Sequence, residues 1–135
     1  MTTRDLMIGD YVTFKDRQND DAHTIVKIEG LGYQGRGVVE EAIVTIDGDE
    51  NGFDLVEIDD EFVGIPLTEK ILYNNGFSNC EFYAELVTDN WQIMCDCHNV
   101  AARCTSGHSI DVQCESVHEL QHVLKLCGIN KEIVL

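Results

Sequence analysis

The sequence lacks long apolar runs and contains only one proline, Pro66. No stretch approaches the roughly 18 apolar residues that a membrane helix needs. The start of the chain has neither the basic nor the apolar segment of a signal peptide. No low-complexity tract occurs, and 44% of the residues are hydrophobic. We therefore expect an ordered, cytoplasmic globular protein of one domain or two very small ones, with no membrane segment.

Basic residues are also scarce, with 9 Lys and Arg against 25 Asp and Glu, a net charge of −16. Residues 1–64 hold 16 acidic and 5 basic side chains (−11), whereas residues 65–135 hold 9 and 4 (−5). No basic residue lies between Gly37 and Glu69. A phosphate backbone repels such a surface, so nucleic-acid binding is not expected. The acidity either keeps the protein soluble or forms a surface that docks on a basic protein.

The first half of the sequence predicts a β module. Short apolar stretches separated by polar or glycine-rich turns are expected as strands at residues 8–14, 23–28, 38–46 and 53–58. Strands of this length and spacing favour a small, bent sheet or an SH3-like barrel. We assign residues 1–62 to this acidic β module.

The second half predicts strands together with two short capped helices, near residues 68–75 and 117–127. Thr68 is expected to cap the first helix, and Gly76 to end it so that Phe77 returns to Leu72. Further strands are expected at residues 80–87, 91–97, 100–104, 108–114 and 131–135. Residues 63–135 therefore form an α+β part, either as a separate domain or continuous with the first module, and the predicted fold class is α+β.

The helix near the C-terminus carries its own start and stop signals. Ser116 and Glu119 match a capping box, in which the serine hydroxyl accepts a helix N–H and the carboxylate reaches back to the N-cap N–H. Gly128 supplies a left-handed stop, so Ile129 is expected to fold back on Leu124. The apolar positions of the helix and strands predict a core of Phe82, Trp91, Ile93, Ile110, Val112, Leu120 and Leu124.

Three short segments resemble a known family. The opening IGDYV (8–12), the I-P-L-T segment (65–68) before a helix ending in G-F, and the V-H-E-L-Q tail (117–121) carry the resemblance. They are similar to segments of a family of small uncharacterised Bacteroidetes proteins, often found in phage and mobile-element neighbourhoods. Residues 78–114 contribute little to the match. The resemblance implies a phage or mobile-element context but no established activity.

The six cysteines raise the question of a metal or thiol site. Four of them fall within twenty residues, but no C-x-x-C pair occurs, and zinc sites normally use ligands two to four residues apart across a tight turn. Cys95 and Cys97 are expected on one buried strand face, so we interpret the cysteines as small core residues with reduced thiols. Thiol catalysis is not indicated, because Cys97 and His98 would point to opposite faces of a strand.

Residues 118–122 form a literal H-E-x-x-H motif, the pattern in which two histidines bind zinc and the glutamate acts as a base. His118 and His122 share a helix face and are therefore weak zinc candidates. A zinc enzyme also needs a third ligand and a cleft, and Glu119 already has a capping role in the first helical turn. We interpret the two histidines as a solvent-facing pair.

The segment DGDENG (47–52) resembles the first half of an EF-hand loop. Asp47, Asp49 and Asn51 are weak calcium candidates, because oxygens at alternate positions can wrap the ion. The twelfth position of the loop is Ile58 instead of the required glutamate. An acidic β-turn accounts for the same residues.

No catalytic or cofactor-binding residue emerges from these patterns, so we predict no cofactor and favour a protein that is not an enzyme. The first hypothesis is an accessory or protein-interaction protein of a phage or mobile element, with an acidic surface that docks on a basic partner. The alternative is a small enzyme or ligand-binding domain whose site comes from scattered residues. A deep polar pocket with a perturbed titratable group would favour that alternative.

Overall fold

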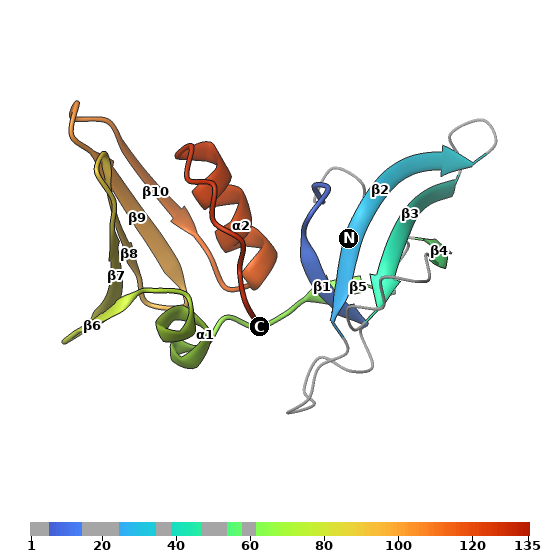
Figure 1. Cartoon of the computed structure of the whole chain (residues 1–135), viewed down its shortest axis with the longest axis horizontal. Helices are drawn as coiled ribbons and strands as arrows, with labels where there is room; N and C mark the ends of the chain where they lie inside the picture. The colour runs from blue at the N-terminus through green and yellow to red at the C-terminus, as the bar shows by residue number, and fades with distance from the viewer. Residues whose placement is uncertain (1–5, 15–24, 35–38, 47–53, 58–61) are drawn as a thin grey trace. The chain divides into compact units, whose positions relative to one another are not determined.

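The computed structural model describes residues 6–14, 25–34, 39–46, 54–57 and 62–135. The chain divides into two compact units, Met1–Ile65 and Pro66–Leu135. Each unit contains one antiparallel five-stranded sheet, and two helices belong to the second (Figure 1). The predicted α+β class is therefore confirmed.

The sheet of unit 1 has the strand order β4-β3-β2-β1-β5. Its strands are β1 (Tyr11–Phe14), β2 (Val26–Gln34), β3 (Val39–Ile46), β4 (Asp54–Glu57) and β5 (Phe62–Gly64). The register of β2 against β3 shifts between Ile28 and Gly30, which marks a β-bulge. Strands β4 and β5 end the sheet on opposite sides, and no pairing among the described residues closes a barrel. The SH3-like barrel therefore stays a prediction.

The core of unit 1 lies on one face of this sheet. The first strand begins at Tyr11, later than predicted, because Gly9 adopts φ +97° and Asp10 closes a turn by accepting the Met7 N–H at 2.8 Å. The buried side chains of this core are Leu6, Val12, Val26, Ile28, Val44 and Phe62. The rings of Phe14 and Phe62 stack with their centroids 5.7 Å apart.

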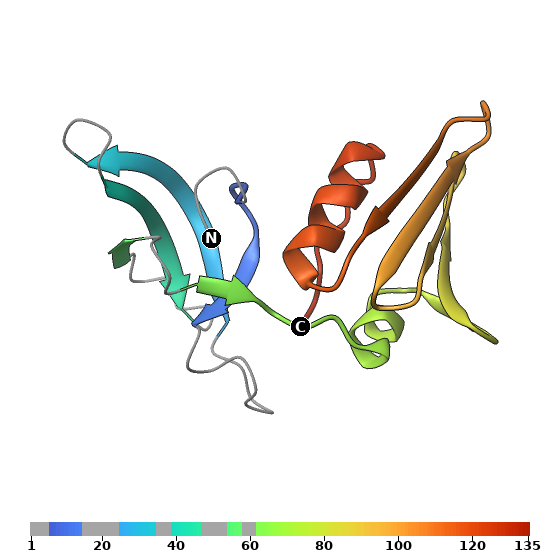
Figure 2. The same ribbon diagram turned by 180° about the vertical axis from the view of Figure 1, so that it is seen from behind.

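The sheet of unit 2 is an antiparallel meander in the order β10-β9-β8-β7-β6. Its strands are β6 (Ser78–Cys80), β7 (Tyr83–Val87), β8 (Trp91–Cys95), β9 (Asn99–Cys104) and β10 (Ser109–Gln113). The helices are α1 (Glu69–Asn74) and α2 (Val117–Leu126), and α2 lies along one face of the sheet (Figure 2). That face contributes Ile93, Val100 and Ala102, which have no solvent exposure.

Both ends of α1 form as the sequence predicts. The Thr68 hydroxyl accepts the Ile71 N–H at 3.3 Å, and so caps the first turn. Gly76 adopts φ +88°, and the Phe77 N–H reaches back to the Leu72 carbonyl at 3.1 Å. Phe77 and Leu72 are both buried. The glycine is required here because a left-handed residue must follow the helix for this return.

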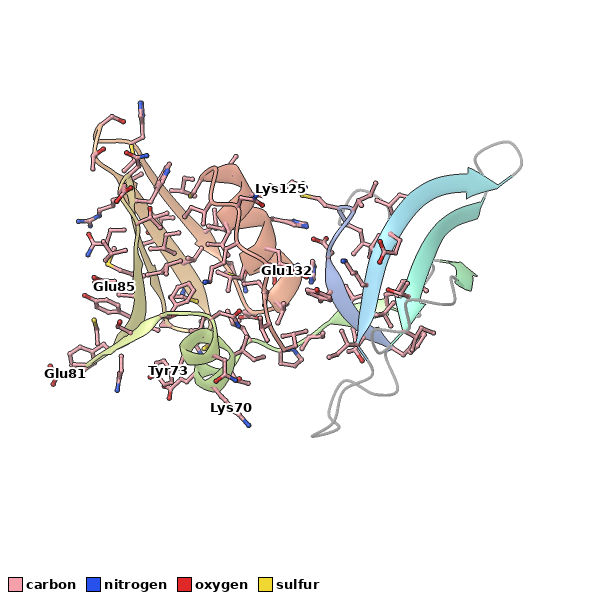
Figure 3. All side chains as sticks on the ribbon, viewed as in Figure 1. Lys70, Tyr73, Glu81, Glu85, Lys125 and Glu132 are labelled. Carbon is pink, nitrogen blue, oxygen red and sulfur yellow. The ribbon has the colours of Figure 1, made fainter. Side chains whose placement is uncertain are left out.

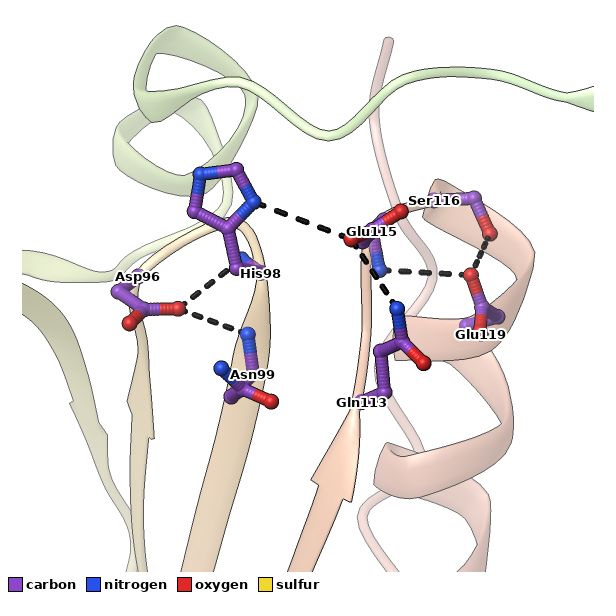
Figure 4. Close-up of polar contacts among 7 residues, drawn as sticks. All are labelled: Asp96, His98, Asn99, Gln113, Glu115, Ser116 and Glu119. Carbon is purple, nitrogen blue, oxygen red and sulfur yellow. Dashed lines mark hydrogen bonds and ion pairs between the residues drawn. The ribbon is translucent and has the colours of Figure 1, made fainter.

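The start of α2 differs from the predicted capping box. Ser116 is the N-cap residue, but its hydroxyl accepts no helix N–H. Instead the hydroxyl donates to Glu119 Oε1 at 2.7 Å, and this carboxylate also accepts the Glu115 N–H at 3.3 Å (Figure 4). A capping box would have each side chain accept a backbone N–H, whereas here the carboxylate accepts both bonds and one of them comes from the serine hydroxyl. The end of the helix is as predicted, because the Ile129 N–H bonds to the Leu124 carbonyl at 2.9 Å after Gly128 (φ +71°).

The predicted final strand at residues 131–135 is wrong, since this segment pairs with no strand. A buried side chain directly after α1 holds its backbone instead. The Asn75 amide accepts the Val134 N–H at 2.7 Å through Oδ1 and donates to the Val134 carbonyl at 2.8 Å through Nδ2. Nδ2 also donates to the Ile71 carbonyl at 2.8 Å. One amide thus satisfies both backbone groups of a residue 59 positions away.

The predicted core of the second half is correct in part. Ile93, Leu120 and Leu124 are buried, and Trp91 and Ile110 are half-buried. Two residues were assigned wrongly: Phe82 is 82% exposed and Val112 is 41% exposed. Phe82 lies in the turn between β6 and β7, so the predicted strand 80–87 begins only at Tyr83, as β7, and Cys80 belongs to β6. Val112 lies on the edge strand β10.

Candidate functional site

Helix α2 brings together the two histidines of the H-E-x-x-H motif. Their rings contact each other edge to face, with centroids 5.7 Å apart and an interplanar angle of 80°. His118 is only 8% exposed and His122 is half-buried. The expected solvent-facing pair is therefore wrong for His118. It lies in the first turn of the helix, next to the buried N-cap Ser116.

A small polar network surrounds the N-terminus of α2. Ser116 Oγ lies 3.1 Å from His118 Nδ1 and 2.7 Å from Glu119 Oε1. The hydroxyl has a single proton, which it donates to the carboxylate, so the ring nitrogen must be the donor in the other contact. A catalytic serine needs the opposite arrangement, with the histidine accepting the hydroxyl proton. The network therefore orients the first turn of the helix and does not activate Ser116.

No third metal ligand joins the histidines within the part of the chain that the structure describes. No group of three or more His, Cys, Asp or Glu side chains there is arranged to hold an ion. The weak calcium candidates Asp47, Asp49 and Asn51 lie outside the described residues.

Three cysteines of unit 2 are core residues, as the sequence predicts. Cys95, Cys114 and Cys127 are buried, and all six thiols are free. The thiol of Cys114 donates to the Ser116 carbonyl at 3.9 Å, and its interaction with the sulfur of Cys95 raises the pKa of Cys114 and lowers that of Cys95. Burial removes both sulfurs from solvent, so they act as small apolar groups.

Cys97 does not lie on a strand, which corrects the face it was expected to share with Cys95. Strand β8 ends at Cys95, and Cys97 adopts φ +69° in the turn to β9. The Asp96 carboxylate holds this turn by accepting the N–H groups of His98 at 2.9 Å and Asn99 at 2.7 Å (Figure 4). Burial and the neighbouring Cys95 raise the pKa of Cys97 to about 11, so it is a poor nucleophile at neutral pH.

An exposed aromatic group on unit 2 is the feature that the sequence reading missed. Phe82 in the β6–β7 turn, Tyr83 on β7 and Tyr73 on α1 are 82%, 36% and 39% exposed. Burial raises the pKa of Tyr73, and the nearby Glu69, Cys97 and Cys80 raise it further. These residues belong to α1, the β8–β9 turn and β6, so the three elements lie near Tyr73. The polar residues Ser78, Asn79 and Glu81 just before Phe82 were the available signal for a turn.

Comparisons with known proteins give no relative. The sequence matches no protein-family model, and neither a curated protein nor a solved structure is significantly similar to it. Within the described residues, no helix is both long and apolar enough to cross a membrane.

Proposed function

We propose that this chain is a non-enzymatic, cytoplasmic interaction protein of a phage or mobile element, and that its acidic surface binds a basic protein. The observation that carries the proposal is the charge: unit 1 holds 16 acidic and 5 basic residues, and residues 38–68 contain no basic residue. A field of one sign steers encounter with a basic partner and weakens with added salt.

Two further observations support an interaction protein over an enzyme. The hydroxyl proton of Ser116 is committed to Glu119, and the raised pKa of Cys97 keeps its thiol protonated. Neither group is therefore prepared for nucleophilic attack. A protein that acts by binding needs no such activated group.

The test is capture of partners from a Bacteroidetes lysate by the full chain, followed by identification and reconstitution of each partner. We expect a basic protein whose binding is lost at high salt. Replacing Glu40 and Glu57 by Gln should weaken binding, while the matched pair Asp89→Asn and Asp111→Asn in unit 2 serves as a charge control. Salt-insensitive binding, or affinity for duplex DNA at physiological salt, would contradict the proposal.

A further inference from the structure

The sheet of unit 2 ends in a strand whose outer edge pairs with no other strand among the described residues. Strand β6 pairs only with β7, in the register Ser78↔Glu85, Asn79↔Ala84 and Cys80↔Tyr83. Figures 1 and 2 show β6 at the outer border of this sheet. An uncovered edge is a template for another strand unless the protein blocks it.

The register fixes which backbone groups this edge offers. Only Glu81 and Phe82 separate Cys80 from Tyr83, so Cys80 and Tyr83 form the hydrogen-bonded pair that closes the turn. Pairs alternate along an antiparallel ladder, so the N–H and C=O of Asn79 point away from β7. Asn79 thus presents one donor and one acceptor in the geometry that a sixth strand requires.

Strand β6 is short, with three residues, but it lacks the side chains that usually protect an edge strand. Its residues Ser78, Asn79 and Cys80 include no lysine, no proline and no charged side chain. The exposed ring of Phe82 lies directly beyond the strand, with Tyr83 next to it. Exposed aromatic side chains of this kind are common anchors of protein interfaces.

The acidic side chains near the β6 edge favour a basic partner. Glu81 lies in the turn and Glu85 opposite Ser78, on the same side of unit 2 as Tyr73 (Figure 3). The small Ser78 side chain leaves Glu85 within reach of a long cationic side chain across the edge. Two lysines lie near α1, and neither belongs to the β6–β7 hairpin. Lys70 extends away from the hairpin in Figure 3, and Lys131 Nζ lies beside Gly76, before β6 begins.

We propose that an extended, lysine- or arginine-bearing segment of the basic partner adds to the sheet of unit 2 as a sixth strand on β6. The main chain of this segment bonds to the backbone of Asn79. One of its apolar side chains contacts Phe82 and Tyr83, and its cationic side chains lie near Glu81 and Glu85. This inference deepens the proposed function and rests on it. The acidic unit 1 then speeds encounter, and the β6 edge supplies the specific contact.

The probe is an octapeptide of alternating lysine and valine, titrated into the ¹⁵N-labelled full chain and followed by amide shifts. We expect shifts concentrated on residues 78–83 and slower hydrogen exchange at the Asn79 amide. The matching glutamate–valine peptide should not bind. The Asn79→Pro variant removes the outward N–H, which bonds to no residue of β7, and should weaken binding about 10-fold, whereas Asn79→Ala keeps the N–H and should bind normally.

A second pair of variants tests the charge. Glu81→Lys in the β6–β7 turn should weaken binding several-fold at low salt, and Asp89→Lys in the next turn, with the same charge change, should not. Shifts confined to unit 1 would overturn this inference while leaving the proposed function intact. Concentration-dependent self-association through β6 would also overturn it, because the occupant would be a second copy. If neither the peptide nor any basic lysate protein binds, both proposals fail.

Discussion

The two units stabilise similar sheets in different ways. Unit 1 buries an apolar cluster that includes Leu6 and Phe62 and carries most of the net negative charge, whereas unit 2 covers its sheet with α2. Side-chain hydrogen bonds to the backbone hold turns in both units, through Asp10 in unit 1 and Asp96 in unit 2. Three side chains of unit 2 bond to backbone groups: Thr68 at the start of α1, Asn75 on the C-terminal segment and Asp96 in the β8–β9 turn. Such bonds restrict the conformation of the backbone, which suits the strand edge and aromatic side chains that we propose as a binding surface.

The two units also suit the two kinds of recognition that we propose. Charge of one sign acts over a distance of about 10 Å, tolerates variable geometry and is screened by salt. A strand edge with adjacent aromatic rings acts only at contact and depends on geometry. The charge of one sign follows from the sequence of unit 1, whereas the strand edge with its aromatic rings follows from the fold of unit 2.

Core truncations should have the largest effect, and they test whether the units are independent. We expect Leu120→Ala to lower the free energy of unfolding of unit 2 by about 2–5 kcal/mol, because Leu120 is fully buried. Phe62→Ala should destabilise unit 1 by about 3–5 kcal/mol. Trp91, the only tryptophan, reports unit 2 alone by fluorescence, and circular dichroism reports both units. If Phe62→Ala shifts the Trp91 transition as much as Leu120→Ala does, the two-unit comparison is wrong.

The Asn75 contact should have the next largest effect. Asn75→Ala removes three hydrogen bonds to Val134 and Ile71, and we expect a loss of about 2 kcal/mol with fast hydrogen exchange at the Val134 amide. The neighbouring exposed Asn74→Ala is the control and should change stability little. An unchanged exchange rate at Val134 in the Asn75 variant would show that other contacts hold the C-terminal segment.

Thiol reactivity within unit 2 should show a smaller but site-specific difference. The hydrogen bond to Ser106, at 2.8 Å, lowers the pKa of the partly exposed Cys104, whereas burial raises that of Cys97 to about 11. We expect iodoacetamide at pH 8 to modify Cys104 well before Cys97, as measured by peptide mass spectrometry. Ser106→Ala should slow the reaction of Cys104, and faster labelling of Cys97 would contradict the assignment.

The smallest effect should come from the pH dependence of the Asp96 turn. Hydrogen bonds from the Asn99 and His98 N–H groups lower the pKa of Asp96 below its usual value of 3.8. A lowered pKa in the folded state gives stability that is present above pH 3.8 and is lost as the pH falls below it. Asp96→Asn should therefore flatten the acid limb of the stability curve, and Asp111→Asn is the exposed control. Identical acid limbs for wild type and Asp96→Asn would contradict this.

Prediction from the sequence succeeded where the contacts are local. Strands β7 to β10, both helices and their glycine stops were anticipated to within a few residues, because each depends on residues at most five positions apart. Strand β6 and the turn at Phe82 were not. The hydrogen bond from the Ser116 hydroxyl to the Glu119 carboxylate was not anticipated, since a capping box predicts that each of these side chains accepts a backbone N–H. Strand β8 was predicted to reach Cys97 because the apolar pattern continues to that residue. The strand ends at Cys95 instead, since the Asp96 carboxylate holds a turn there.

The sequence by itself determined the two helices, the alternation of the strands and the uneven charge, because these follow from the order of residues along the chain. The tertiary structure decided which side chains are inside. Phe82 is exposed because the hairpin turns there, His118 is buried although it lies in a polar motif, and Asn75 holds Val134 from 59 positions away. Such outcomes depend on which distant segments pack together, and that packing is a property of the whole fold.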